Sequence, residues 1–166
     1  LGPVKKYLLL NTRFIAPSRY GDSAFLSRLK DHLDRLVHAS GLTGFVFCDA
    51  YLLTALAKSM PPELTCRLEA VPGVNCIIDS PERATAFLDL TQGLGFARPS
   101  RIILDRNLNR QPKRLADLSC AVKKQWPGIR VELLANEGCL FQCPFKQAHD
   151  AHISLANLSG TCRRPH

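Results

Sequence analysis

Two cysteines and two histidines lie close together near the end of the chain. Cys139 and Cys143 are four residues apart, Pro144 follows the second cysteine, and His149 and His152 come just downstream. Thiolates and imidazoles are the side chains that bind zinc and other transition metals, and thiolates hold iron–sulfur clusters. The stretch therefore predicts a metal centre.

Two ligand sets compete for that centre. An iron–sulfur cluster would use three thiolates and a fourth ligand that the sequence does not show, and the thiolates would be Cys139, Cys143 and Cys162. A zinc ion would use two thiolates and two imidazoles, namely Cys139, Cys143, His149 and His152. Because the cysteine spacing departs from the CxxC pattern of zinc sites, the sequence favours the cluster. Two alternatives need no metal: a pair of reduced structural cysteines, or a thiol nucleophile activated by a histidine.

The other cysteines indicate a reducing compartment. The chain has seven cysteines, an odd number, and most stand in apolar surroundings. A secreted disulfide framework would show an even, regularly spaced set. Cys48, Cys76 and Cys120 have the neighbours expected of small apolar side chains. We therefore expect a cytoplasmic protein.

Composition and charge narrow the class of protein. With 166 residues, 46% apolar and 22% charged, the chain fits one globular domain. Its apolar runs are short, so no membrane span is predicted. The net charge of +8 is compatible with an anionic partner such as RNA. The alternative is a solvated basic face, because no aromatic side chains interleave with the basic clusters.

Strand-type and helix-type patterns alternate along the chain and must position these groups. Strands are predicted at residues 7–11, 44–49, 101–105 and 130–135, and helices at 24–39, 50–59, 80–93, 112–125 and from Cys143 or Pro144 to Asn157. Pro144 suits the first turn of that last helix. Residues 65–79 contain two apolar runs around Pro72 and Gly73, which predicts two short strands joined by a turn.

Repeated strand–helix units predict an α/β fold with parallel strands and right-handed crossovers. About five units are present, whereas a complete eight-fold barrel needs roughly 250 residues. We expect a single domain over residues 1–166 with an incomplete, TIM-barrel-like sheet, a fragment of a longer barrel, and a cysteine segment at 136–166. The alternative is a small doubly wound α/β sheet, although no glycine-rich phosphate loop follows the first strand.

Polar side chains follow the predicted strands, at positions that line the catalytic rim in a barrel. In chain order they are Asn11 and Arg13, Asp49, Asp79, Asp105 and Arg106, and Asn136 and Glu137. The acids and amides among them are also common helix caps. If the rim is an active face, Asn11 lines the substrate side, and the candidate catalytic carboxylates are Asp49, Asp105 and Glu137.

Several stretches resemble the collagenase-like peptidase family, called U thirty-two. They are RIILDRNLN followed by RVELLANEGCLFQCPFKQAHD, and earlier YLLLN, GFVFCDAYLL and VNCIIDSPERATAFL. The resemblance covers nearly the whole chain but only the middle of a full-length member. It implies a barrel-like fold and, by similarity to relatives, a role in oxygen-independent hydroxylation of ubiquinone precursors or of tRNA or ribosomal RNA.

Several members of that family carry a [4Fe-4S] cluster on four cysteines. By resemblance, Cys139, Cys143 and Cys162 match three of those ligands, and no later cysteine supplies a fourth. Three functions follow as expectations: an iron–sulfur protein supporting hydroxylation of an aromatic or nucleobase substrate, a cysteine- or metal-dependent peptidase, and a non-catalytic binding fragment. A protein partner that completes the barrel is a further expectation.

Overall fold

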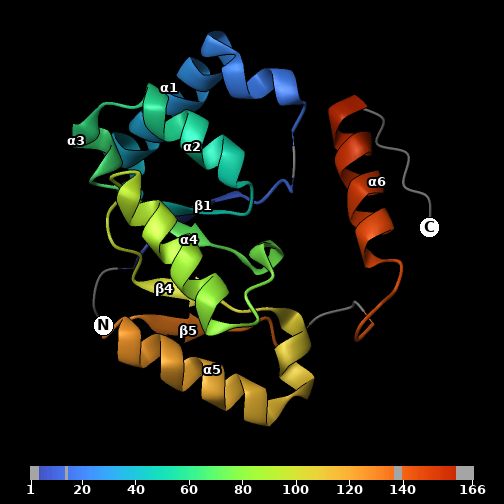
Figure 1. Ribbon diagram of the computed structural model, residues 1–166. Helices are drawn as coiled ribbons and strands as arrows, with labels where there is room; N and C mark the ends of the chain where they lie inside the picture. Colours follow the sequence, from blue (N-terminus) through green and yellow to red (C-terminus); the bar gives the residue numbers. More distant parts are fainter. Residues whose placement is uncertain (1–3, 14, 137–139, 160–166) are drawn as a thin grey trace.

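The computed structural model describes residues 4–13, 15–136 and 140–159, and its strands and helices alternate along the chain (Figure 1). The strands are β1 (Tyr7–Leu10), β2 (Gly44–Phe47), β3 (Glu69–Pro72), β4 (Arg101–Ile103) and β5 (Arg130–Glu132). The helices are α1 (Ser23–Ser40), α2 (Ala50–Ser59), α3 (Pro62–Thr65), α4 (Pro81–Gly93), α5 (Pro112–Gln125) and α6 (Lys146–Ser159). Three short 3-10 turns are η1 (Pro17–Gly21), η2 (Val74–Cys76) and η3 (Arg106–Arg110).

All paired strands run parallel and follow one another in chain order. β1, β2 and β3 form one sheet, and β4 pairs with β5 in another. Two backbone hydrogen bonds join the sheets: Ala97 N donates to Leu68 O at 3.0 Å, and Asp105 N donates to Ile78 O at 2.9 Å. Sequential order is the barrel arrangement, whereas a doubly wound sheet reverses its order at a switch point. The incomplete barrel-like α/β fold is therefore confirmed, and the five described strands do not close into a barrel.

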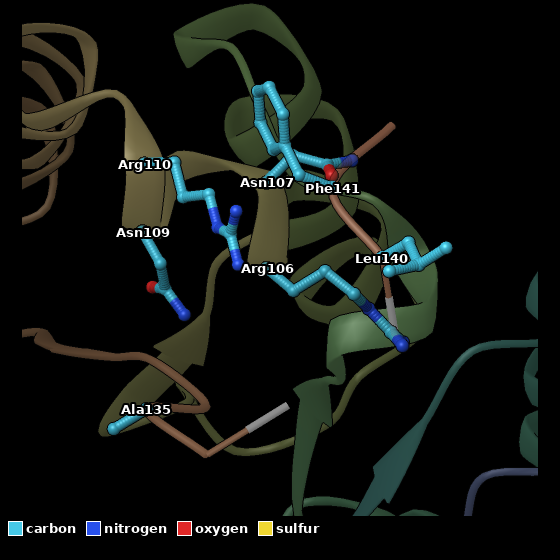
Figure 2. Close-up of a pocket in the computed structure, with 7 residues that line it drawn as sticks. All are labelled: Arg106, Asn107, Asn109, Arg110, Ala135, Leu140 and Phe141. Carbon is cyan, nitrogen blue, oxygen red and sulfur yellow. The ribbon is translucent and has the colours of Figure 1, made fainter. Parts of the chain in front are cut away.

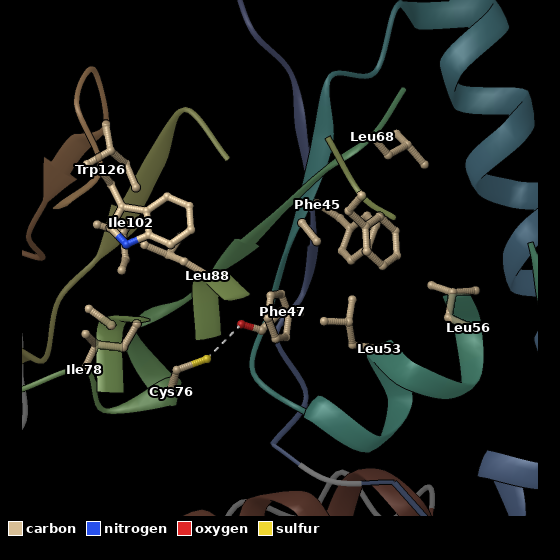
Figure 3. Packing of buried hydrophobic residues seen from close by; sticks show 14 of the residues in the cluster. Phe45, Phe47, Leu53, Leu56, Leu68, Cys76, Ile78, Leu88, Ile102 and Trp126 are labelled. Atoms are coloured by element: carbon tan, nitrogen blue, oxygen red, sulfur yellow. Dashed lines mark hydrogen bonds between the residues drawn. The ribbon is translucent and has the colours of Figure 1, made fainter. Parts of the chain in front are cut away.

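The core lies between one face of the sheet and helices α1, α2, α4 and α5 (Figure 3). Alternation along the strands sends Phe45, Phe47 and Ile102 to this face, where they are almost fully buried. Phe45 packs edge-on against Phe96, with ring centroids 5.5 Å apart. Each such aromatic side chain contributes about 2–3 kcal/mol through burial.

The opposite face of the sheet would point into the barrel. Leu9 on β1 is 70% exposed on this face, because no described element covers it. A polar network occupies the end where the strands begin: Glu69 accepts hydrogen bonds from Lys5, Tyr7 and Ser100 at 2.7 to 2.9 Å. This inner face is therefore part apolar and part charged.

Local signals explain where the helices begin and end. Asp22 caps α1 by accepting from Phe25 N at 2.9 Å, and Ser80 caps α4 by accepting from Arg83 N at 3.2 Å. Gly41, at φ 66°, ends α1 in the left-handed conformation that glycine adopts readily. Helices α2 and α5 have the bounds that the sequence predicts. Within the described residues, no helix combines the length and apolar character needed to cross a bilayer.

Three predictions about the elements are wrong. The second strand expected within residues 65–79 is the 3-10 turn η2, after which Ile77 adopts φ 53° and the chain turns rather than extends. Helix α6 begins at Lys146, so Pro144 lies before its first turn. Strands β4 and β5 are also shorter than predicted, with three residues each.

Candidate functional site at the carboxyl ends of the strands

The carboxyl ends of β1 to β4 meet on one side of the molecule, because the strands are parallel and in register. Asn11 and Arg13 follow β1, Asn75 follows β3, and Arg106 follows β4. Helix α6 stands at this side, apart from the helices that cover the core (Figure 1). We call this region the strand-end rim, defined by Asn11–Arg13, Asp49, Asn75, Asp105–Arg110 and α6.

Two arginines converge on one amide oxygen at the rim. Arg13 Nη2 donates to Asn75 Oδ1 at 2.9 Å, and Arg106 Nη2 donates to the same oxygen at 3.0 Å. One neutral acceptor thus holds two guanidinium groups close together at the strand ends. A guanidinium group is a donor that matches carboxylates and phosphates.

Helix α6 brings a carboxylate to these guanidinium groups. Asp150 forms an ion pair with Arg13, and Lys146 Nζ donates to Asp150 Oδ2 at 2.7 Å. Beside the pair lies a cavity of ≈ 170 Å³, lined by Asn11, Thr12, Arg13, Asn75, Asp150, Ile153 and Ser154. The cavity is large enough for several water molecules or a small ligand.

The predicted catalytic acid Asp49 lies at the rim, but its contacts there stabilise the fold. It is 5% exposed, and its Oδ1 accepts from the backbone nitrogens of Tyr51 and Leu52, both at 3.0 Å, which caps α2. Its Oδ2 accepts from the Tyr20 hydroxyl at 2.7 Å. Burial, together with the Asp49 carboxylate, raises the pKa of Tyr20 to about 12, so this hydroxyl stays a donor.

Of the other two predicted catalytic acids, the structure describes only one. Asp105 is buried at the end of β4, and its Oδ2 accepts from Asn107 Nδ2 at 3.0 Å. Glu137 lies outside the described residues. Asn11, predicted to line the substrate side, does line the cavity, and its Oδ1 is buried without a hydrogen-bond partner among the described residues.

Of the predicted metal ligands, the structure describes Cys143, His149 and His152. Cys143 is half-buried ahead of α6, and both histidines are exposed on that helix. Cys139 and Cys162 lie outside the described residues. The described part of the chain contains no group of three His, Cys, Asp or Glu side chains that could hold a metal ion. The cluster and zinc predictions both depend on Cys139, so both stay predictions.

The segment that carries Cys143 is attached to the rim through η3. Gln142 N donates to Asn107 Oδ1 at 3.2 Å, and Arg110 Cζ lies 5.9 Å from the centre of the Phe141 ring. Asn109 projects from η3 toward the segment around Ala135, where its Nδ2 donates to Leu134 O at 2.6 Å (Figure 2). A cavity of ≈ 90 Å³ lies here, lined by Arg106, Asn107, Asn109, Arg110, Ala135, Leu140 and Phe141.

Two further thiols lie at the strand ends, where the sequence indicates only small apolar side chains. Cys48 Sγ donates to Thr12 O at 3.1 Å, and Cys76 Sγ donates to Phe47 O at 3.4 Å (Figure 3). Burial raises the pKa of each thiol to about 12. Cys120, which has the neighbours expected of a small apolar side chain, lies on α5 and is exposed.

The sequence missed Asn75 and Asp150 as site residues. Asn75 falls in the segment predicted as a strand, and Asp150 is one of several polar residues on a helix without marked amphipathic character. Neither has a sequence signal, because only the tertiary fold brings them to Arg13.

No family model and no curated protein matches the chain. Among solved structures, it is similar to the U32 peptidase Mk0906, with a TM-score of 0.63 and 22% sequence identity. The fold resembles that of a U32 peptidase. The similarity covers 98% of this chain and 58% of the other, so the chain spans little more than half of that neighbour's length. This agrees with the expected U32 relation at the level of the fold.

Proposed function

We propose that the chain is the cysteine-bearing part of an iron–sulfur protein with a U32-like barrel, which supports hydroxylation of an aromatic or nucleobase substrate at the strand-end rim. The observation that supports this proposal is the attachment of the cysteine segment to η3, through Gln142 and Phe141. It holds Cys143 next to the rim, and in barrel folds the chemistry takes place at this rim.

The donor set must be completed from outside the described residues. Cys143 is one thiolate, and the described part of the chain offers no second and third donor beside it. Cys139 and Cys162 would supply two more thiolates. When bound, such a cluster transfers single electrons.

In this proposal, the described residues at the rim bind the substrate. Arg110 and Phe141 offer a guanidinium plane and a ring on which a base or an aromatic ring can stack. Arg106 and Arg110 together would attract the phosphates of RNA, so RNA is the macromolecular substrate that we propose for this face.

Anaerobic reconstitution with iron and sulfide tests the proposal. We expect visible charge-transfer absorption with stoichiometric iron and sulfide in the unmodified chain, and its loss in Cys143→Ser. Cys66→Ser is the matched control, because Cys66 is an exposed thiol next to α3 and should leave the absorption unchanged. A reconstituted chain without iron, or a Cys143→Ser variant with a full complement, would show that the proposal is wrong.

A peptidase is the second candidate, and the name of the structural neighbour favours it. Cys48 and Cys76 are poor nucleophiles for such an enzyme, because thiols with a pKa of about 12 stay protonated near neutral pH. Cys143 would therefore be the nucleophile. Peptide turnover that survives metal removal and disappears in Cys143→Ser would favour this function over the cluster.

A further inference from the structure

The ion pair between Asp150 and Arg13 places a carboxylate at the rim, where the carboxylate of a ligand could take its place. Asp150 lies on α6, whereas Arg13 follows β1. Both side chains are about three-quarters or more buried, at 20% and 24% exposed. An arginine fork is well matched to a carboxylate, and partial burial strengthens the pairing.

Arg13 is oriented before any ligand arrives. Its Nη2 donates to Asn75 Oδ1 at 2.9 Å, and Arg106 holds that same oxygen from the other side at 3.0 Å. Asn75 sits in η2, whose backbone is fixed by hydrogen bonds such as Cys76 N to Gly73 O at 2.9 Å. A side chain that is already fixed loses little conformational entropy when it binds a ligand.

Helix α6, by contrast, is weakly anchored. Its Ser154 is 3% exposed, whereas Ile153, Leu155 and Leu158 are 47%, 61% and 43% exposed. Because the described side chains of the helix bury little apolar surface, the ion pair between Asp150 and Arg13 is one of the contacts that hold it at the rim. Such a helix can shift enough to withdraw Asp150 from Arg13 without disturbing the core.

The cavity of ≈ 170 Å³ beside the pair has room for more than a carboxylate group. Ile153 gives it an apolar wall, and Asn11 Oδ1 is a buried acceptor without a partner among the described residues. A ligand that donates a hydrogen bond to this oxygen would satisfy it, which is favourable because an unsatisfied buried acceptor costs free energy.

We propose that Arg13, Asn75 and Lys146 form a carboxylate-binding subsite, which the Asp150 side chain occupies until a ligand displaces it. The ligand class is an organic acid whose carboxylate contacts Arg13, whose apolar body contacts Ile153 and whose hydrogen-bond donor faces Asn11. The subsite requires no cysteine, so its test is independent of the test of the iron–sulfur proposal.

Removal of the internal carboxylate tests this subsite in the whole chain. Benzoate presents the carboxylate and the apolar body of this ligand class without its hydrogen-bond donor, and its binding is measured by calorimetry in the unmodified chain, in Asp150→Ala and in the double variant Arg13→Gln/Asp150→Ala. We expect Asp150→Ala to bind benzoate about tenfold more tightly, because an occupied site is available only in the fraction of molecules from which Asp150 has left. The double variant should lose that gain.

Two controls separate this effect from a general change in charge. Asp34→Ala removes a half-exposed carboxylate from α1, remote in sequence from the rim, and should leave benzoate binding unchanged. Inorganic phosphate and acetate should bind Asp150→Ala more weakly than benzoate, because both leave the apolar wall at Ile153 uncovered.

Three outcomes would overturn the proposal: no gain in Asp150→Ala, a gain that persists without Arg13, or phosphate binding as tight as benzoate binding. If Asp150→Ala does not fold, hydrogen exchange in the unmodified chain replaces it. Excess benzoate should then accelerate exchange of the α6 amides while the α1 amides stay unchanged, and equal protection with and without benzoate would exclude displacement.

Discussion

At the scale of single residues, burial decides which thiols can react. Cys48 and Cys76 lie at the ends of β2 and β3 with the pKa of each raised to about 12 by burial, whereas Cys66 and Cys120 are exposed. At pH 8 a thiol with that pKa is ionised in about one molecule in 10,000. We therefore expect brief iodoacetamide treatment to label Cys66 and Cys120 long before Cys48 and Cys76, as measured by mass spectrometry of the peptides.

The same treatment in denaturant provides the control for this experiment. All seven cysteines of the unfolded chain should then be labelled at similar rates, because burial no longer suppresses ionisation. Fast labelling of Cys48 or Cys76 in the folded chain would contradict their assignment as structural thiols and would renew their candidacy as nucleophiles.

Individual residues also show how far the sequence predicts the site. The rim positions of Asn11, Asp49 and Asp105 follow from the alternation of strands and helices, since parallel strands end on one side. Their roles do not follow, because Asp49 as a cap and Asp49 as a catalytic acid have the same sequence signature. The contacts of Arg13 with Asn75 and Asp150 join residues far apart in the chain, and no local pattern encodes them.

At the scale of elements, the pairing of β2 with β3 requires a glycine at residue 44. A Cβ at Gly44 would lie 2.1 Å from Glu69 O, which is backbone and cannot move aside without breaking the register. We expect Gly44→Ala to lower the free energy of unfolding by about 2 kcal/mol or more, as steric overpacking does. The measurement is the midpoint of urea unfolding followed by circular dichroism.

Gly93→Ala is the matched control for the β2–β3 test. Gly93 is the last residue of α4, and a Cβ there would meet nothing within 4 Å. Alanine favours the helix, so stability should stay the same or rise by up to about 1 kcal/mol. Equal effects of the two substitutions would argue against the close approach of β2 and β3.

Elements also divide into those that the sequence predicts and those that it does not. The bounds of α2 and α5 follow from local signals: an acidic cap and a proline stop for α2, and a proline start for α5. The segment of η2 has the apolar pattern of a strand, but its apolar residues are buried by tertiary packing and not by strand pairing. Tertiary packing of this kind overrides local propensity.

At the scale of the whole molecule, Glu69 joins the two sheets. Its carboxylate accepts from Lys5 and Tyr7 at the first strand and from Ser100 ahead of β4. Burial by itself would raise the pKa of Glu69, but the hydrogen bonds from Lys5, Ser100 and Tyr7 outweigh it and lower the pKa below its ordinary value of 4.5. The carboxylate is therefore more acidic in the folded chain than in the unfolded chain.

The sign of the pH dependence follows from this lowered pKa. The stabilisation from Glu69 is fully present above pH 4.5 and is lost as the pH falls through the lower pKa of the folded state. We expect Glu69→Gln to be less stable than the unmodified chain at pH 7 and to lose less stability on acidification, as measured by urea unfolding at several pH values. Glu63→Gln, an exposed residue on α3, should keep the full acid dependence, and parallel curves for Glu69→Gln and the unmodified chain would contradict the assignment.

The chain-order arrangement of β1 to β5 has a consequence for synthesis on the ribosome. Strands β2, β3 and β5 each pair with the strand made just before them, so each of them meets a partner that has already emerged. The early units can thus acquire structure while later ones are still being translated. Among the described elements, α6 is made last. Only then can Asp150 pair with Arg13, which is made more than a hundred residues earlier.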